Sequence, residues 1–177
     1  QGALMTETTD APTTGKRRAT FNTLEVSELR RLTDDSVEIT FAVPEELADD
    51  YDYVPGQYVA LRKELDGAEV RRSYSICAVP KRGEIRVAVK KDIGGKFSTW
   101  ANESLEVGEK IDVMNPQGAF TSRTHVTSLN DAQKVAAEKV AEKKDTHLVA
   151  FAAGSGITPI MAIAKAVLAL SLIHISE

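Results

Sequence analysis

Arginine, tyrosine and serine alternate over one short segment that could contact a bound cofactor. The segment reads Arg71-Arg72-Ser73-Tyr74-Ser75-Ile76. A guanidinium binds a phosphate through two parallel hydrogen bonds, a phenol ring offers a flat face to a planar heterocycle, and a hydroxyl can bond a ring nitrogen. The same residues also suit an ordinary strand in which the tyrosine packs and the arginine is solvated. Taken alone, the segment leaves both interpretations open.

A glycine pair followed by a serine forms the second candidate site, Gly94-Gly95-Lys96-Phe97-Ser98. Glycines let backbone N–H groups approach a phosphate, and the N-terminus of a helix favours its negative charge. The Ser98 hydroxyl adds a further donor. Because a plain glycine turn capped by serine has the same composition, a phosphate site and a simple turn both stay open.

The third candidate follows an apolar run and precedes an apolar helix, and it reads Ala153-Gly154-Ser155-Gly156-Ile157-Thr158-Pro159. A glycine turn between a strand and a helix is the context of a dinucleotide pyrophosphate site. The segment is not a P-loop, and a proline stands where the GxGxxG fingerprint has its third glycine. A proline fits the first turn of a helix, because its missing N–H would have no partner there. A tight strand–helix turn is the alternative.

The elements that must position these segments are read from hydrophobic periodicity. Val37, Ile39, Phe41 and Val43 alternate with other residues, as in a half-buried strand. Similar alternation between Phe21 and about Thr121, with frequent turns, predicts several short antiparallel strands in a closed or nearly closed barrel. Further predicted strand positions are Leu24 and Val26, 57–61 after Pro55-Gly56, Ile85 to Val89, and Ile111 with Val113. One short helix is expected over Ser98 to Leu105.

A different pattern begins at Asn130. The stretch 131–144 is rich in Ala, Lys and Glu and fits an exposed helix or charged insertion, with a partner-binding helix as the alternative. The apolar run 147–153, the glycine turn and a helix from Ile157 to about Leu170 make a strand–turn–helix unit. That unit opens a parallel α/β sheet. Because one such unit cannot cover both faces of a parallel strand, we expect the natural domain to continue.

These patterns divide the chain into five parts. Residues 1–20 are expected to be a disordered N-terminal segment, and 21–125 a β-barrel. A linker with the charged insertion follows at 126–145, and the start of an α/β domain at 146–170. The end, 171–177, resembles read-through sequence fused where the domain breaks off.

Composition excludes several classes of function. The formal net charge is −4, which argues against a nucleic-acid-binding or anionic-membrane surface. Cys77 is the single cysteine and the three histidines lie far apart, so neither a disulfide nor a metal site is expected. The only long apolar run contains Pro159 and Lys165 and is read as a buried helix, not a membrane span. With no secretory signal at the start, we expect a cytoplasmic protein.

The order of the three candidate segments resembles the ferredoxin–NADP reductase family. An Arg-x-Tyr-Ser strand precedes a Gly-x-x-Ser helix start, and a strand ending in Gly-x-Gly-x-x-Pro follows. Pro55-Gly56-Gln57-Tyr58 and Gly118-Ala119-Phe120 also match family positions. The resemblance covers about 21–170 and is closest to the reductase components of phenylacetyl-CoA epoxidases.

The resemblance implies a fold and a set of cofactor-binding residues. The fold would be a six-stranded antiparallel FAD-binding barrel followed by the first β–α unit of a truncated NAD(P)-binding domain. Arg72 would bind the FAD pyrophosphate, Tyr74 would stack on the isoalloxazine, and Ser75 would bond near its N5. The remaining implied FAD contacts are Ser73, Gly94, Gly95, Lys96, Phe97 and Ser98, and those to the nicotinamide dinucleotide are Gly154, Ser155, Gly156, Thr158 and Pro159.

The resemblance also implies a function. The parent would pass electrons from NAD(P)H through FAD to an iron–sulfur centre and an oxygenase component or ferredoxin, in phenylacetate degradation. Hydride transfer to a flavin needs no acid–base residue, so none is named. The 2Fe–2S cluster would belong to a C-terminal part that this chain lacks, and the shortened chain would have weak or no turnover. A flavin-binding electron-transfer subunit of another system, or a non-catalytic β-barrel binding module, remains the alternative.

Overall fold

The computed structural model describes residues 18–120 and 154–172, and its main body is a six-stranded antiparallel sheet with the strand order β4-β3-β6-β1-β2-β5. The strands are β1 (Phe21–Thr33), β2 (Ser36–Ala42), β3 (Tyr58–Leu65), β4 (Ala68–Ser75), β5 (Glu84–Lys90) and β6 (Lys110–Met114). The helical elements are η1 (Glu45–Leu47), α1 (Lys96–Glu103), η2 (Gly154–Gly156) and α3 (Ile157–Leu172).

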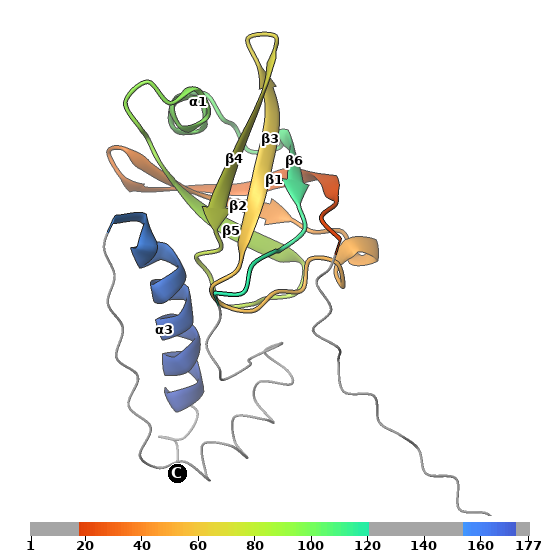
Figure 1. Ribbon diagram of the computed structural model, residues 1–177, viewed down its shortest axis with the longest axis vertical. Coiled ribbons are helices and arrows are strands. Elements are labelled where there is room, and N and C mark those ends of the chain that lie inside the picture. Colours follow the sequence, from red (N-terminus) through yellow and green to blue (C-terminus); the bar gives the residue numbers. More distant parts are fainter. Residues whose placement is uncertain (1–17, 121–153, 173–177) are drawn as a thin grey trace, which may run out of the picture.

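The two edges of the sheet meet just after β4. Ile76 forms a bridge with Val87 of β5, and the Cys77 N–H donates to the carbonyl of Arg86 at 3.0 Å. Figure 1 shows β3 and β4 standing steeply across β1, β2 and β5, as expected when a strongly twisted sheet curls on itself. The predicted antiparallel barrel is therefore confirmed.

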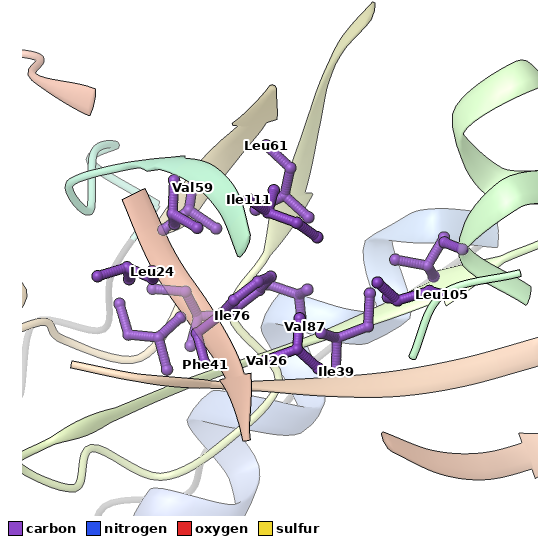
Figure 2. Close-up of a cluster of buried hydrophobic side chains, with 14 of the residues drawn as sticks. Leu24, Val26, Ile39, Phe41, Val59, Leu61, Ile76, Val87, Leu105 and Ile111 are labelled. Atoms are coloured by element: carbon purple, nitrogen blue, oxygen red, sulfur yellow. The ribbon is translucent and has the colours of Figure 1, made fainter. Parts of the chain in front are cut away.

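Alternation along the strands fills the barrel interior. In β2 the side chains of Val37, Ile39 and Phe41 are buried in the core. Val89 and Val87 of β5 lie opposite Val37 and Ile39 and are buried with them. Figure 2 shows this cluster, in which side chains from β1, β2, β3, β5 and β6 point toward one another. The same alternation places the intervening residues of β2 and β5 on the outer face of the barrel.

Two tyrosines fasten the long connection between β2 and β3 to the barrel. The Tyr51 hydroxyl donates to the carbonyl of Val113 at 2.5 Å and accepts from Asn22 Nδ2 at 3.3 Å. The Tyr53 hydroxyl donates to the carbonyl of Val79 at 3.1 Å. Both tyrosines are buried, and burial raises the pKa of each phenol. The short helix η1 in this connection was not predicted from the sequence.

The helices agree with expectation apart from their boundaries. The helix predicted from Ser98 begins two residues earlier, at Lys96, because Gly95 takes an extended conformation and its carbonyl accepts the first helical bond, from Thr99. The apolar helix α3 begins at Ile157, as predicted. It continues to Leu172, so the tail predicted over 171–177 begins two residues too early. The predicted strand 147–153, the charged insertion 131–144 and residues 173–177 lie outside the described residues. Among the described helices, none is long and apolar enough to cross a membrane.

The core generates a first prediction. Phe41 is fully buried, so Phe41→Ala should lower the free energy of unfolding by about 3–5 kcal/mol through lost burial and the cavity left behind. Val107 is 59% exposed, and Val107→Ala should change it by no more than about 0.5 kcal/mol. Urea denaturation monitored by Trp100 fluorescence measures both. Equal losses in the two variants would contradict the assignment of the core.

Candidate functional site

Strand β4 sorts the predicted arginine, tyrosine and serines onto two faces. Arg72 lies opposite Leu61 and Tyr74 lies opposite Val59, and both partners are core residues of β3. Directly opposed residues in an antiparallel pair project to the same face. Arg72 and Tyr74 therefore share the inward-facing side of β4, at the end where the barrel opens toward α1. The other face of β4 carries Arg71, Ser73 and Ser75.

An aromatic row connects β4 to α1. The rings of Tyr74 and Phe97 lie 5.8 Å apart with an interplanar angle of 35°, and Phe97 meets Trp100 edge-on at 5.5 Å. Phe97 is fully buried and belongs to the barrel core. The Phe97 side chain thus serves as packing, which leaves its backbone N–H, the group the resemblance implies, to face a ligand. The row fixes the start of α1 beside the inward-facing side of β4.

Charges of both signs face the Tyr74 phenol. Burial and then the Asp92 carboxylate raise the pKa of Tyr74 to about 12, while the Arg72 guanidinium acts in the opposite direction. Arg72 donates through Nη1 to the carbonyl of Arg71 at 2.7 Å, and it has no ion-pair partner within residues 18–120 and 154–172. An exposed guanidinium with no carboxylate partner therefore lies next to a half-buried aromatic face. Asp92 carried no recognisable signal in the sequence.

Three hydrogen bonds brace the glycine turn before α1. The Asp92 N–H donates to Ser98 Oγ at 3.0 Å, the Gly95 N–H donates to the carbonyl of Asp92 at 3.0 Å, and the Ser98 hydroxyl donates to the carbonyl of Gly95 at 3.3 Å. Gly94 adopts φ +75°, which favours glycine. Ser98 is buried, so its hydroxyl holds the turn in shape, whereas the sequence suggested a donor to a ligand.

The turn leaves backbone donors at the beginning of α1. The first bond inside the helix joins the Thr99 N–H to the Gly95 carbonyl at 3.0 Å, so the N–H groups of Lys96, Phe97 and Ser98 precede the helical ladder. Beside them lies a hollow of about 410 Å³, lined by the glycine pair, by α1 and by the β3–β4 hairpin. Trp100 lines this hollow, with Lys63 Nζ 5.3 Å from its ring centre. The sequence analysis did not single out Trp100. Its position four residues after Lys96, one helical turn further along, could have placed it on the same side of α1.

Two further segments meet at the end of β3. The Tyr58 N–H donates to the carbonyl of Gln117 at 2.9 Å, and Gln57 Nε2 donates to the carbonyl of Gly118 at 3.3 Å. Gly56 has φ +101°, and a Cβ there would overlap the Phe120 carbonyl oxygen, which only glycine avoids. The structure thus joins the Pro55-Gly56-Gln57-Tyr58 and Gly118-Ala119-Phe120 segments that the sequence singled out.

The third predicted segment forms η2 and the first turn of α3. Gly154 takes φ +55° with open space around it, and Thr158 and Pro159 are partly buried. Pro159 occupies the first turn of α3, where no backbone N–H bond is lost. Of Ser155 and Gly156, only the backbone of the short 3₁₀ turn is described. Within the described residues, no cluster of metal-binding side chains is present.

Cys77, just beyond β4, is buried, with 8% of its surface exposed. Its Sγ lies 3.6 Å from Oε2 of Glu38, to which the thiol donates. Burial, together with the Glu38 charge and that hydrogen bond, raises the pKa of Cys77 to about 12, while Lys165 acts weakly in the other direction. The thiol is therefore held in its neutral form near pH 7, and the thiolate, which is the nucleophilic form, is disfavoured.

The braced turn yields a prediction with a matched control. A Cβ at Gly95 would overlap Ser98 Oγ, so Gly95→Ala should displace the hydroxyl and release the Asp92 N–H. Gly94→Ala meets no atom within 4 Å and should cost only the strain of its positive φ, about 1–2 kcal/mol. Amide hydrogen exchange at Asp92 should accelerate in Gly95→Ala and stay near wild type in Gly94→Ala. Unchanged exchange at Asp92 in Gly95→Ala would refute the bracing role of Ser98.

The buried thiol yields a third prediction. At pH 8 the native protein should react with a disulfide reagent at least about 100-fold more slowly than the protein in urea, because little of the thiol is exposed and little of it is ionised. The folded pKa of Cys77 lies above the ordinary thiol value of 9.0, so its contribution to stability is present below about pH 9 and is lost as the pH rises. The free energy of unfolding should accordingly fall more steeply above about pH 9 in wild type than in Cys77→Ala. Labelling of native protein at the unfolded rate would be the contrary result.

Comparison with known proteins bears on this arrangement. Residues 23–122 match the family described as the oxidoreductase FAD-binding domain. One component of the 1,2-phenylacetyl-CoA epoxidase from Escherichia coli K12 is 43% identical over 144 residues, which cover 81% of this chain and 36% of that protein. The ferredoxin reductase component of 3-ketosteroid-9-alpha-monooxygenase from Rhodococcus rhodochrous is 33% identical over 147 residues, covering 82% of this chain and 36% of the relative.

Solved structures show the same fold. The ferredoxin reductase of carbazole 1,9a-dioxygenase superposes with a TM-score of 0.64 at 23% identity, covering 86% of this chain and 41% of that one. An Amycolatopsis cytochrome P450 reductase gives a TM-score of 0.65 at 23% identity, covering 92% and 43%. The chain spans just over a third of the length of the two curated relatives. Since the family match covers more than half of the sequence and the barrel agrees with it, the chain belongs to the FAD-binding oxidoreductases of the ferredoxin–NADP reductase type.

Proposed function

We propose that this chain is the flavin-binding part of a reductase that takes electrons from NAD(P)H and passes them through FAD to an iron–sulfur centre and an oxygenase. The observation that carries the proposal is the convergence of Arg72, Tyr74 and the start of α1 on one side of the barrel. These groups come from segments about twenty residues apart and supply a cation, an aromatic face and backbone donors. That combination fits a planar ring attached to a diphosphate.

The residues present fit FAD on grounds of chemistry and space. Arg72 has no ion-pair partner in the described part of the chain, and the first N–H groups of α1 are free for an anion, so together they would hold the diphosphate. Tyr74 would support the isoalloxazine ring. The hollow of about 410 Å³ beside Lys96 and Trp100 would take the adenosine end, which favours FAD over the shorter FMN.

The chain's own residues would bind and orient the cofactor. Bound FAD supplies the capacity to accept two electrons from a nicotinamide and to release them singly. Tyr74 keeps its proton well above neutral pH, so the ring that supports the flavin stays uncharged. Ser98 holds Gly95 and Asp92 in place, which keeps the backbone donors of α1 aimed at one point. Ser73 and Ser75, on the other face of β4, would contribute through their backbone or at the strand end.

The nicotinamide dinucleotide would meet the segment before α3. Gly154, Ser155 and Gly156 let the backbone approach a pyrophosphate, and Thr158 and Pro159 shape the first turn of the helix. The chain spans just over a third of the two curated relatives, and we infer that the rest of the parent supplies whatever distinguishes NADPH from NADH. Turnover with NAD(P)H therefore requires the parent protein, and this shortened chain should bind flavin with little or no activity.

The acceptor proposal rests on sequence identity. The relative at 43% identity is one component of an epoxidase acting on phenylacetyl-CoA, and the relative at 33% is a monooxygenase reductase component. We infer an oxygenase of the phenylacetyl-CoA epoxidase type, in phenylacetate degradation, with a 2Fe–2S cluster in the missing C-terminal part. A single buried thiol is compatible with the reducing conditions of the cytoplasm.

Two neighbouring arginines provide the test of the flavin site. Arg72→Ala should weaken FAD binding at least about tenfold, because a charge-assisted hydrogen bond to a phosphate contributes about 1.5–3 kcal/mol. Arg71 faces the other side of β4, with its guanidinium 4.9 Å from the Phe21 ring centre. Arg71→Ala should therefore change binding by less than about twofold. Titration of FAD into apoprotein, followed by flavin fluorescence, measures both constants.

The possible results distinguish an error in the location of the FAD site from an error in the proposed function. A flavin visible spectrum in the purified wild type, lost selectively in Arg72→Ala, supports the proposal. Equal retention in Arg72→Ala and Arg71→Ala would mean that FAD binds elsewhere. A wild-type protein that folds and binds no flavin would leave only the alternative of a non-catalytic barrel.

A further inference from the structure

A second hollow lies on the outer face of the barrel and contains none of the residues assigned to FAD or nicotinamide. Its volume is about 310 Å³. β1 and β2 contribute Arg30 and Glu38, β5 contributes Glu84 and Arg86, and α3 contributes Lys165. The segment after β4 completes the wall with Cys77, Ala78, Val79 and Lys81. Figure 1 shows α3 standing beside the barrel, which is how a helix so distant in sequence reaches this surface.

The hollow is cationic although the protein is acidic. Four basic side chains line it against two carboxylates, which leaves an excess of two positive charges, in a chain whose formal net charge is −4. The Cys77 thiol is neutral, because its pKa lies near 12. A concave surface with an excess of one sign of charge concentrates small ions of the opposite sign.

Both carboxylates are already occupied. Oε1 of Glu38 accepts from Nε and Nη2 of Arg30 at 3.1 and 3.0 Å, and its Oε2 accepts from the Cys77 thiol. Glu84 pairs through Oε1 with Nη2 of Arg86 at 2.7 Å and through Oε2 with Lys81 at 2.9 Å. Each of the four carboxylate oxygens therefore already accepts at least one hydrogen bond or ion pair from a lining side chain.

Two cationic donors remain without a partner. Arg86 Nε is buried and makes no hydrogen bond within the described part of the chain. Lys165 forms no ion pair with any residue in 18–120 or 154–172, although it is close enough to influence the Cys77 thiol. A buried N–H without an acceptor is unfavourable, and the Arg86 guanidinium and the Lys165 ammonium group, which line the same hollow, match a tetrahedral oxyanion.

We propose that this hollow binds a phosphate group, either the free ion or the phosphoryl end of a larger ligand, through Arg86 Nε and Lys165. The space exceeds what one bridging water fills, since a water occupies about 30 Å³. The site joins strands β2 and β5 to α3, so its occupant would contact the barrel and the first helix of the next domain at once. It does not depend on the proposed flavin function.

Calorimetric titration with inorganic phosphate, at ionic strength held constant with chloride, tests the site. Binding should be saturable in wild type and at least about tenfold weaker in Lys165→Gln, which removes an exposed charge without disturbing the core. Arg86→Lys keeps the charge and removes Nε–H, and it should weaken binding similarly. Lys110→Gln and Arg82→Lys change cations outside the hollow and should leave the affinity within about twofold.

The Arg72→Ala variant tests whether the phosphate site is independent of the proposed flavin site. Phosphate should bind Arg72→Ala as it binds wild type, and the Arg86 Nε–H resonance, identified by its absence in Arg86→Lys, should shift saturably. Tighter binding of glycerol 3-phosphate than of phosphate supports an ester phosphate as the ligand, and the reverse order supports the free ion. Loss of binding in Arg72→Ala, unchanged affinity in both Lys165→Gln and Arg86→Lys, or no saturable heat at matched ionic strength would each overturn the proposal.

Discussion

The packing of Phe97 is the contact on which the candidate flavin site depends. Its ring is fully buried in the barrel core, yet it touches Tyr74 on one side and Trp100 on the other. A ring packed in the core has little freedom to move. Its contact with Tyr74 therefore holds the start of α1 close to the end of β4. The glycine turn therefore stands beside the face of β4 that carries Arg72 and Tyr74. Phe97 therefore positions the candidate site through the packing of its side chain, while only its backbone N–H could contact a ligand.

The arrangement also shows how an acidic protein can present local cationic sites. A net charge describes the whole surface, whereas an anion responds to the cations within a Debye length, about 8–10 Å. Arg72 and the outer-face cations around Arg86 are local exceptions, created where carboxylates are absent or already paired. The argument against nucleic acid from a charge of −4 concerns an extended surface and leaves single phosphate sites possible.

Much of the barrel could be predicted from the sequence because its signal is local. Alternation at Val37, Ile39 and Phe41 identifies a half-buried strand without knowledge of its partners. The start of α1 was placed two residues late, since serine is a frequent N-cap and Ser98 looked like one. In the structure Ser98 lies inside the helix and bonds backward to Asp92 and Gly95. The Gly-x-x-Ser motif therefore identified the correct turn, but it did not show that the Ser98 hydroxyl bonds within that turn.

What could not be predicted depends on contacts between distant segments. The hollow around Arg86 draws on β1, β2, β5, the segment after β4 and α3, and none of these contains a recognisable motif for it. Alternation explains why the cluster exists: residues between the core positions of β2 and β5 must face outward, and there Glu38 meets Arg30 across the strand pair. These outward-facing side chains form a hollow only where another segment of the chain packs over them. Here α3 covers it with a lysine, so a helix that follows the barrel in the sequence also completes a surface of the barrel.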